Sequence, residues 1–282
     1  MTDTGSPEPI GSDGKVDFTA VRWGSVEWTL LCMLYLRACE SRSPTTILGD
    51  RFAARDVARI EYDWPRVHRA VRPAINQFGV ALRGAQFDTR ITDYLTRRPD
   101  TTVLHVGCGL NSRAMRLTVP ASGRWFDVDF PQVIALRRKL YGESDTYRMI
   151  GSSITEHGWI DELPSGGSVL IVAEGVLMYL APDEVRDLLH RLLDRFQTGV
   201  LLADLLSPWG PRISRLRSGI IKWGTRDGGE PTRWDPRLRL IDESSVIAGF
   251  EKIPLRRPRA LYRMQNAIAT TRNYDRIFRY AF

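Results

Sequence analysis

Apolar residues recur in this 282-residue chain with two different periods, and their order predicts an α/β fold. Short runs rich in β-branched and aromatic residues are typical of buried strands. These runs are residues 103–106, 124–129, 146–150, 168–173 and 200–205. The segments between them carry apolar residues at helical spacing, for example 131–141 and 182–196. Strands that alternate with helices predict a parallel, doubly wound sheet.

A helical region precedes the first of these strands. Apolar residues at three- and four-residue spacing predict helices in four segments, 18–40, 51–63, 65–78 and 85–96. The first residues are rich in Gly, Ser, Pro and Asp, a composition that cannot form a core. We therefore expect three parts in order along the chain: a disordered tail (1–17), a helical arm (18–80) and a sheet domain (81–282).

The regular alternation ends after residue 206. The segment from about 207 to 240 contains four prolines and three tryptophans and is too long for an ordinary connection, which predicts an ordered lid inserted into the domain. Beyond it we expect a helix over 242–249, a strand over 250–255, a helix over 258–271 and a last strand over 277–282. The expected sheet then has seven strands, most of them parallel.

A glycine turn follows the first strand directly. Val106 runs into Gly107, Cys108 and Gly109, and two glycines one residue apart allow a tight turn with no side chain in the way of a ligand. A strand, a glycine turn and a helix form a nucleotide-binding cradle at the carboxyl edge of a parallel sheet. A turn that binds nothing has the same sequence, so the residues downstream decide between the two.

Carboxylates stand where two later strands end. Asp127 and Asp129 close the second strand, where an acid accepts the ribose hydroxyls of NAD or of S-adenosylmethionine, and Glu174 follows the fourth. The third glycine of a dinucleotide fingerprint would fall at Ser112 and is absent. S-adenosylmethionine has no pyrophosphate and does not require that glycine, so the pattern favours it over NAD.

Three segments together resemble the leucine carboxyl methyltransferase family: VLHVGCGLNSRAMRL, WFDVDFPQVIALRR and VAEGVLMYL. The resemblance is closest to the bacterial branch that O-methylates polyketide products in antibiotic biosynthesis, of the tetracenomycin carboxyl-methyltransferase type. It is strong over about 81–208 and weaker over the arm. It implies S-adenosyl-L-methionine as cofactor and the Rossmann-like sheet of that superfamily.

The resemblance also implies roles for individual residues. Arg83 would pair with the methionine carboxylate of the cofactor, in the bidentate geometry that suits a guanidinium. Gly107 and Gly109 would pass beneath the cofactor. Asp129, or less favourably Asp127, would accept the ribose hydroxyls, and one of the two is expected to be structural because alternate strand residues face opposite ways.

Other positions depart from the family pattern or leave two interpretations open. Ser152 and Ser153 stand where relatives often have an acid that contacts adenine, and Asn111 stands where many have Asp. Glu174 corresponds to the acid near the methionine amino group and is a candidate catalytic residue, or is a helix-capping or sheet-edge acid. Tyr179 is a candidate catalytic residue that contacts the substrate, or a core residue.

The tryptophans of the lid are candidate substrate contacts. Trp209, Trp223 and Trp234 would line an aromatic pocket, although a lid packed on its own aromatic cluster would have the same sequence. The histidines show no catalytic pairing, and His105 inside the first strand is expected to be a core residue.

Composition indicates which partners and which cellular compartment are expected. The net charge of +7 is spread along the chain without a block of five or six like charges, which favours a solvated surface over a nucleic-acid interface. The three cysteines form no C-x-x-C pair, as expected for a cytoplasmic protein with neither a disulfide scaffold nor a structural metal site. No apolar run is long enough to span a membrane.

The sequence therefore predicts a small-molecule O-methyltransferase that uses S-adenosyl-L-methionine. A carboxylate of a polyketide-like acid is the first candidate for the acceptor, and a phenolic hydroxyl is the alternative. A cyclase or binding protein that keeps the fold without methyl transfer, and an RNA methyltransferase, are the alternatives from other classes. The sequence does not indicate an oligomeric state.

Overall fold

A seven-stranded sheet forms the centre of the protein, whose computed structural model describes residues 14–216 and 219–282. Its strand order is β5-β4-β3-β6-β7-β9-β8. The bounds are β3 (Thr102–Val106), β4 (Arg124–Asp129), β5 (Tyr147–Gly151), β6 (Ser168–Ala173), β7 (Thr198–Leu206), β8 (Arg239–Ser245) and β9 (Asp275–Ala281). Strands β3 to β7 pair in parallel, and β9 runs antiparallel to both β7 and β8. The predicted doubly wound, mostly parallel sheet is confirmed.

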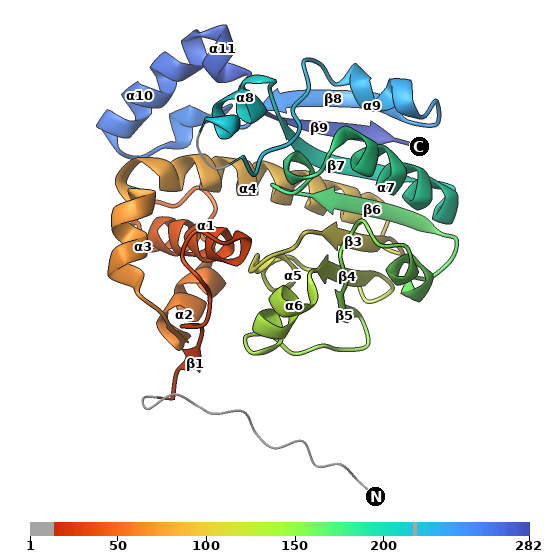
Figure 1. Cartoon of the computed structure of the whole chain (residues 1–282), viewed down its shortest axis with the longest axis horizontal. Coiled ribbons are helices and arrows are strands. Elements are labelled where there is room, and N and C mark those ends of the chain that lie inside the picture. Colours follow the sequence, from red (N-terminus) through yellow and green to blue (C-terminus); the bar gives the residue numbers. More distant parts are fainter. Residues whose placement is uncertain (1–13, 217–218) are drawn as a thin grey trace, which may run out of the picture.

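Helices cover both faces of the sheet and one of its ends (Figure 1). The arm comprises α1 (Val26–Ser41), α2 (Arg51–Arg59) and α3 (Trp64–Val71), and a short parallel pair, β1 (Val16–Asp17) and β2 (Ile60–Glu61). The other helices are α4 (Pro73–Arg97), α5 (Arg113–Arg116), α6 (Pro131–Arg138), α7 (Pro182–Arg195), α8 (Trp209–Arg215), α9 (Gly229–Trp234), α10 (Arg256–Ala267) and α11 (Ala269–Arg272). In Figure 1 the arm lies at the end toward which the parallel strands run.

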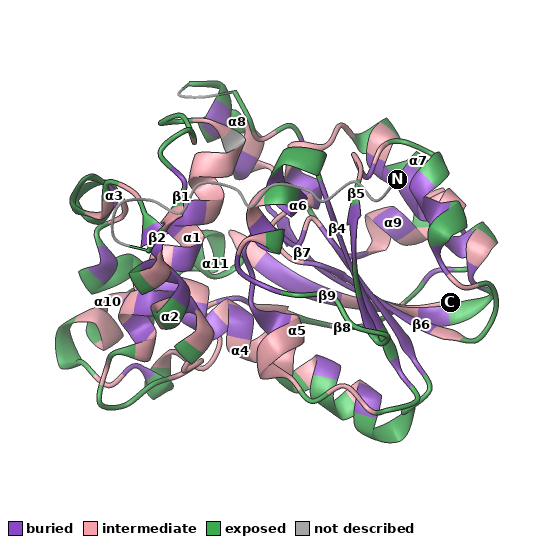
Figure 2. Cartoon of the chain, turned by 90° about the horizontal axis from the view of Figure 1, so that it is seen from below, coloured by how far each residue is buried: buried purple, intermediate pink, exposed green. Residues whose placement is uncertain are grey.

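The strands are buried on both faces, as a parallel sheet requires. Leu104 and Val106 of β3 belong to one hydrophobic cluster, which includes the apolar side of α7, while Val103 belongs to a second cluster with side chains of α1 and α4. This alternation follows the two-residue period of a strand. Figure 2 shows the buried central strands between their covering helices. The site is thus built on a rigid frame.

The helical arm differs from the prediction in three respects. The helix expected from residue 18 begins at Val26, and the helix expected over 51–63 ends at Arg59, where strand β2 follows. The segments expected as separate helices, 65–78 and 85–96, divide at Arg72 instead, whose φ of 47° ends α3. Pro73 then starts one helix of 25 residues, α4, because proline suits the first helical turn. The expected boundary between arm and sheet domain, residues 80 and 81, lies inside α4. Most of the predicted disordered tail (1–13) lies outside the described residues, but its last two residues, Val16 and Asp17, form β1.

The prediction for the region after the lid is partly wrong. Of residues 242–249, expected to be helical, the first four lie in strand β8, which ends at Ser245, and 250–255, expected to be a strand, contain a 3-10 helix over Phe250–Lys252. β8 is an edge strand with one neighbour and is only partly buried, so it tolerates polar residues. Its Asp-Glu-Ser-Ser sequence therefore resembles the start of a helix. The helix expected over 258–271 is present as α10 and α11.

None of the helices within 14–216 and 219–282 combines the length and apolar character needed to cross a lipid bilayer.

Candidate active site

The glycine turn after β3 has the conformation that the sequence predicts. Gly107 and Gly109 have φ angles of 62° and 52°, in the left-handed region that favours glycine. Space is also short, because a Cβ at Gly107 would lie 2.4 Å from Cγ2 of Val176, and one at Gly109 would lie 2.9 Å from Cδ2 of Leu30. The turn therefore packs between the segment after β6 and helix α1.

A cavity of about 240 Å³ opens above this turn, at the carboxyl ends of β3, β4 and β6. We call it the cofactor cavity. Its lining includes Leu30, Met33, Arg37, Arg83, His105, Gly107, Gly109, Asn111, Asp129, Glu174, Val176, Met178 and Tyr179. Helix α1 of the arm supplies the first three of these residues. The arm is therefore part of the site rather than a separate appendage.

Beneath this cavity a row of titratable side chains crosses the sheet, one from each of five neighbouring strands or their ends. In strand order they are Asp127 (β4), His105 (β3), Glu174 (after β6), Asp204 (β7) and Asp275 (β9). Two arginines join them. Arg113 contacts His105 at 3.4 Å and Glu174 at 2.5 Å, and Arg83 contacts Glu174 at 3.0 Å and Asp204 at 2.9 Å.

The two acids of β4 have different environments. Asp127 is fully buried, and its Oδ1 accepts hydrogen bonds from Trp125 and His105 while its Oδ2 accepts from Arg137 and Tyr147. Burial alone would raise the pKa of Asp127, but the adjacent Arg137 and His105 hold it well below its usual range. Asp127 does not line the cofactor cavity and has no acceptor capacity left, so its expected ribose role is wrong and it is the structural member of the pair.

Asp129 does line the cofactor cavity. Its two oxygens each accept one backbone N–H at 2.8 Å, from Gly109 and from Phe130. A carboxylate has about four acceptor positions, so Asp129 retains capacity for a ligand. Burial raises the pKa of Asp129 to about 6, and the two N–H groups oppose that rise only in part.

His105 joins the row as a neutral side chain. Burial lowers the pKa of His105, and Arg113 can only donate, so Nε2 of the imidazole accepts from Arg113 and Nδ1–H donates to Asp127. The expectation of a core histidine is confirmed by this geometry. His105 therefore links Asp127 to Arg113, the arginine that is bonded to Glu174.

Glu174 and Arg83 face each other across the cavity floor. Burial alone would raise the pKa of Glu174, but Arg113 and Arg83 keep it far below its usual range, so it is an anion. Arg83 donates Nε–H to Glu174 and Nη1–H to Asp204. Its Nη2 has no hydrogen-bond partner in the described part of the chain. Nε and Nη1 of this guanidinium are thus bonded to the protein, and Nη2 is available to a ligand.

Sequence reasoning missed two further arginines. Arg37 of α1 lines the cofactor cavity and is held by Asp50 at 3.2 Å and by the carbonyl of Leu110 at 2.9 Å. Arg113 is fully buried over Glu174. A cation in the middle of the apolar pattern of residues 18–40 is the signal that could have identified Arg37.

The remaining candidates separate into two groups. Asn111 and Tyr179 line the cofactor cavity, and Asn111 donates to Glu174 at 3.4 Å. Ser152 and Ser153 do not line it; Ser153 bonds Thr155 and Ser152 reaches a carbonyl and Glu156. Their expected adenine contact has no support in this geometry.

The three tryptophans of the lid do not form one pocket. Trp223 packs on Trp234 with ring centroids 5.3 Å apart, and both join the hydrophobic core on the α7 side of the sheet. The prediction that these two contact substrate is therefore wrong, because the lid segment folds onto its own aromatic pair. Trp209 is separate, and half of its surface is exposed.

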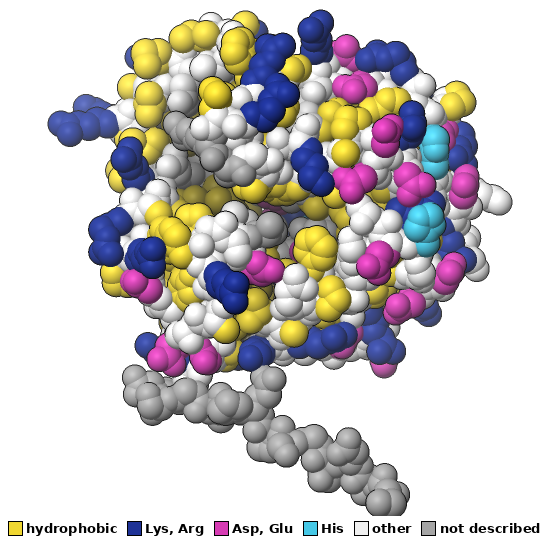
Figure 3. Space-filling model, in the orientation of Figure 1, with side chains coloured by type: hydrophobic (Ala, Val, Ile, Leu, Met, Phe, Trp, Pro, Cys, Tyr) yellow, Lys and Arg dark blue, Asp and Glu magenta, His cyan; other side chains and the backbone are white. Residues whose placement is uncertain are grey.

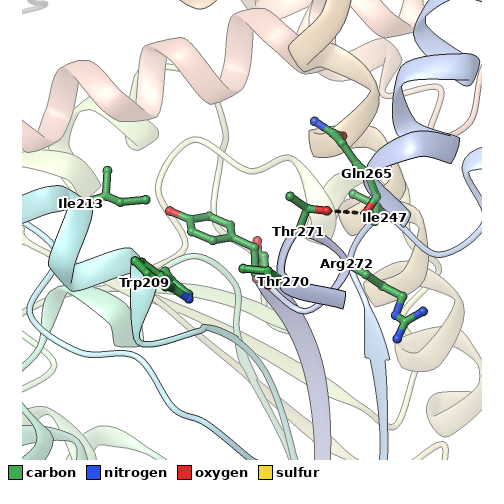
Figure 4. A pocket seen from close by; sticks show the side chains of 9 residues that line it. Trp209, Ile213, Ile247, Gln265, Thr270, Thr271 and Arg272 are labelled. Atoms are coloured by element: carbon green, nitrogen blue, oxygen red, sulfur yellow. Dashed lines mark hydrogen bonds between the residues drawn. The ribbon is translucent and has the colours of Figure 1, made fainter. Parts of the chain in front are cut away.

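Trp209 lines a second concavity of about 450 Å³, which we call the outer groove. The residues around it are Trp209, Ile213, Ile247, Gln265, Thr270, Thr271, Arg272, Tyr274 and Asp275. Figure 4 shows Trp209 and Ile213 of α8 on one side, facing the segment with Thr270 and Thr271. The outer groove includes Asp275, the last member of the row beneath the cofactor cavity.

Figure 3 shows Lys and Arg side chains dispersed among acidic and apolar ones on the face that it presents, rather than gathered in a stripe. This distribution agrees with the preference for a solvated surface.

Comparison with known proteins connects this geometry to a family. The family model described as leucine carboxyl methyltransferase matches residues 31–193, from α1 to α7, and so includes most residues of the cofactor cavity. The tetracenomycin polyketide synthesis O-methyltransferase TcmP of Streptomyces glaucescens is 39% identical over 233 residues, 80% of this chain and 85% of the relative.

Two further matches agree. The S-adenosyl-L-methionine-dependent methyltransferase dpfgK of Gibberella zeae is 34% identical over 65% of this chain and 64% of its own length. A crystal structure of a provisionally assigned methyltransferase from Thermobifida fusca has a TM-score of 0.56 and covers 87% of this chain and 93% of its own, with 16% identity. The last similarity concerns the fold alone.

Proposed function

The chain belongs to the leucine carboxyl methyltransferase family and is an S-adenosyl-L-methionine-dependent methyltransferase, and from this premise we propose that it methylates a carboxylate oxygen of a polyketide-like acid. The observation that carries the proposal is the row of side chains beneath the cofactor cavity. Asp127, His105, Glu174 and Asp204 are each hydrogen-bonded to an arginine or to another member of the row, and Asp275 at the outer end lies 4.0 Å from Nη1 of Arg83. These contacts hold the charges in place, and His105, the histidine that lines the described cavity, has both ring nitrogens engaged and is not available as a base.

The residues of the cavity fit the cofactor. Arg83 would hold the methionine carboxylate, and Glu174, an anion, would suit the methionine amino group. Asp129 keeps acceptor capacity for the ribose hydroxyls next to the glycine turn. S-adenosyl-L-methionine supplies a methyl group that is already activated on sulfur. The protein contributes orientation and exclusion of water, for which Met33, Val176 and Met178 provide apolar walls.

A carboxylate acceptor suits a site of this kind. A carboxylic acid with a pKa near 4 is already ionised at neutral pH and needs no general base. A phenol, with a pKa near 10, normally requires one. The polyketide class of the acceptor is supported by the name of the relative from Streptomyces glaucescens. The arm (18–80) would close over the cofactor, and the segment 207–240 would cover the acceptor side.

Methyl transfer to a carboxylate is expected to be nearly independent of pH from about 6.5 to 9 in single turnovers, with acceptor and cofactor saturating, because no proton leaves the acceptor. The measurement uses methyl-labelled cofactor and two acceptors with the same rings, anthracene-2-carboxylic acid and 2-hydroxyanthracene. We expect label in the acid only, in a product that mild alkali hydrolyses.

The opposite pattern would favour the phenolic alternative. A rate that rises tenfold per pH unit, with an alkali-stable ether from 2-hydroxyanthracene and no ester, contradicts carboxylate methylation. Label in neither compound under conditions where both bind would contradict the proposal as well.

Asp129→Asn is expected to weaken the affinity for S-adenosyl-L-homocysteine by about 5- to 150-fold, equivalent to the roughly 1–3 kcal/mol of a buried polar group left without its partner. Because the pKa of Asp129 is raised to about 6, the wild-type affinity should decrease as the pH falls through 6, when the carboxylate becomes protonated. The variant should lose this pH dependence. Isothermal titration between pH 5 and 8 measures both effects.

Asp145→Asn is a suitable control, since Asp145 is exposed and is not one of the residues that line the cofactor cavity. An Asp129 variant that binds like this control would show that the ribose is held by another group.

A further inference from the structure

Another apolar depression, of about 570 Å³, lies between the start of α4 and α10. Its floor is formed by Ala74, Ile75, Leu255, Pro258 and Leu261, and Arg256 and Arg257 complete its lining. We call it the basic groove. It shares no lining residue with the cofactor cavity or the outer groove. Figure 1 shows the start of α4 and α10 together at the left end of the molecule.

The two walls of the basic groove are held together from behind. Tyr262 of α10 is buried, and its hydroxyl donates to the carbonyl of Ile75 at 3.2 Å. Phe78 and Leu82 of α4 pack with Tyr262 and Ile253 in a small hydrophobic cluster of their own. The groove is therefore a fixed feature of the fold, supported by buried contacts between its walls.

Large apolar side chains remain in contact with water along this groove. Ile75 is 42% exposed and Leu255 is 53% exposed. Met264, on the solvent side of α10 with Ala260, is 59% exposed. Contiguous exposed apolar surface with a polar rim marks an interaction site, whereas single exposed apolar residues do not.

The rim of the groove carries positive charge that the described residues do not neutralise. Residues 64–87 and 253–274, which contain α3, the start of α4 and α10, include no Asp or Glu. Several exposed arginines of these segments form no hydrogen bond or ion pair through their guanidinium groups within residues 14–216 and 219–282. These are Arg69, Arg72, Arg256, Arg257 and Arg263.

Exposed arginines in other parts of the surface have acidic partners. Arg186 pairs with Asp183 at 2.9 Å, and Arg233 pairs with Asp227 at 3.4 Å. Unpaired guanidinium groups beside an apolar floor are complementary to a surface that is both acidic and apolar. Arginine is also one of the residue types enriched at protein–protein interfaces.

We propose that the basic groove is a docking site for an acidic amphipathic helix of another protein. Helices that bind in a groove do so through apolar side chains at three- and four-residue spacing. Those side chains would occupy the floor around Ile75 and Leu255, and carboxylates on either side of them would pair with Arg256 and Arg257. The inference does not depend on which acceptor the enzyme methylates.

Two other occupants fit the groove less well. A second copy of this chain, bound through the same surface, would bring the unpaired arginines of both copies together, and like charges at an interface repel. Helices that lie on a lipid bilayer insert projecting apolar side chains, often Trp and Phe. In this groove the apolar side chains are aliphatic and line a depression between two helices.

The test uses a designed, fluorescein-labelled helical peptide of about 16 residues. It carries leucine at three- and four-residue spacing and glutamate on either side, and a second peptide has glutamine in place of each glutamate. Each peptide is titrated into the full-length protein at about 0.1 M salt, and fluorescence anisotropy is measured. The glutamate peptide should bind saturably, at least about tenfold more tightly than the glutamine peptide.

Arg256→Gln combined with Arg257→Gln should weaken binding of the glutamate peptide by at least about tenfold and that of the glutamine peptide by less than about threefold. Ile75→Ala should weaken binding of both peptides by about fivefold, because it removes part of the apolar floor. The matched control combines Arg186→Gln with Arg233→Gln, which removes the same amount of charge from paired arginines elsewhere. It should bind both peptides like the wild type.

Affinity for S-adenosyl-L-homocysteine, measured in every variant, should stay within about threefold of the wild type, which shows that the fold and the cofactor cavity are intact. This measurement keeps failure of the docking site distinguishable from failure of the proposed function.

Several results would overturn the proposal. Without saturable binding of the glutamate peptide to the wild type, the groove is not a site for an acidic helix. An equal loss of affinity in the control pair would make the effect one of net charge alone. Binding to phosphatidylglycerol vesicles in place of the peptide, abolished by Arg256→Gln with Arg257→Gln, would assign the groove to a membrane surface. A change of oligomeric state in Ile75→Ala on sedimentation would make it a contact between copies.

Discussion

Asp127→Ala is expected to lower the free energy of unfolding by about 3–5 kcal/mol, the cost of breaking a buried ion pair by removal of one partner. Both Asp127 and Arg137 are fully buried, and among residues 14–216 and 219–282 Arg137 bonds no other carboxylate; its remaining hydrogen bonds go to the carbonyl of Gly109 and to Tyr147. The variant therefore leaves a cation in the core without a counter-ion. The loss also removes the support of His105.

The effect should depend on pH in a defined direction. The pKa of Asp127 is lowered in the folded protein, so its contribution to stability is present above the unfolded-state pKa of about 4 and is lost as the pH falls below that value. The difference in stability between wild type and Asp127→Ala should consequently be constant from about pH 6 to 8 and should shrink in acid.

Urea denaturation at several pH values measures this difference. Asp194→Ala is the control, because Asp194 forms an exposed ion pair with Arg237 and should change stability by less than about 1 kcal/mol. If Asp127→Ala were no more destabilising than this control, the buried network would not be a determinant of the fold.

Much of the fold could be predicted from local patterns. Strands β3, β4, β6 and β7 are buried on both faces, so they are rich in apolar residues, with few polar ones among them, and a short window of sequence identifies them. Strand β8 could not be identified in this way, because an edge strand with one neighbour tolerates polar residues and carries no strong period. The division of α3 from α4 depends on the left-handed conformation of Arg72, and Pro73, which directly follows it, is the sequence signal that marks this helix boundary.

Residues of the site could be predicted from the sequence where the backbone conformation allows only one residue type. Gly107 and Gly109 lie at positive φ against Val176 and Leu30, and Asp129 follows the strand that faces them. The choice between Asp127 and Asp129 required the structure, since both end the same strand and only their hydrogen-bond partners distinguish them.

The charged support of the site could not be predicted. Arg37, Arg113 and Asp204 come from α1, α5 and β7, segments far apart in sequence that meet only when the sheet is assembled. Composition suggested that Trp223 and Trp234 line a substrate pocket, but tertiary packing places both in the hydrophobic core. The sequence alone does not distinguish these two outcomes.

Arg83→Ala is expected to weaken the affinity for S-adenosyl-L-homocysteine by at least about 100-fold, the effect of truncating one partner of a buried charged pair. Arg83 lines the cofactor cavity and donates to Glu174 and Asp204, and its Nη2 has no hydrogen-bond partner among the described residues, so one planar group can hold two acids and a ligand together. Arg83→Lys should recover little of the affinity, because an ammonium is a point charge and cannot reproduce that fork.

A direct role of Arg83 is separable from a structural one by the choice of ligand. 5′-Methylthioadenosine has the adenosine and the sulfur but neither the carboxylate nor the amino group, so its affinity should change by less than about threefold in Arg83→Ala if the residue acts on the methionine end. Arg90→Ala, on the same helix and paired with Asp242 away from the cavity, should bind both ligands like the wild type. Equal losses for both ligands would instead assign Arg83 to the scaffold, where it would stabilise Glu174 and Asp204 without contacting the cofactor, and the methionine carboxylate would then have to be held by Arg37, the other arginine that lines the cavity.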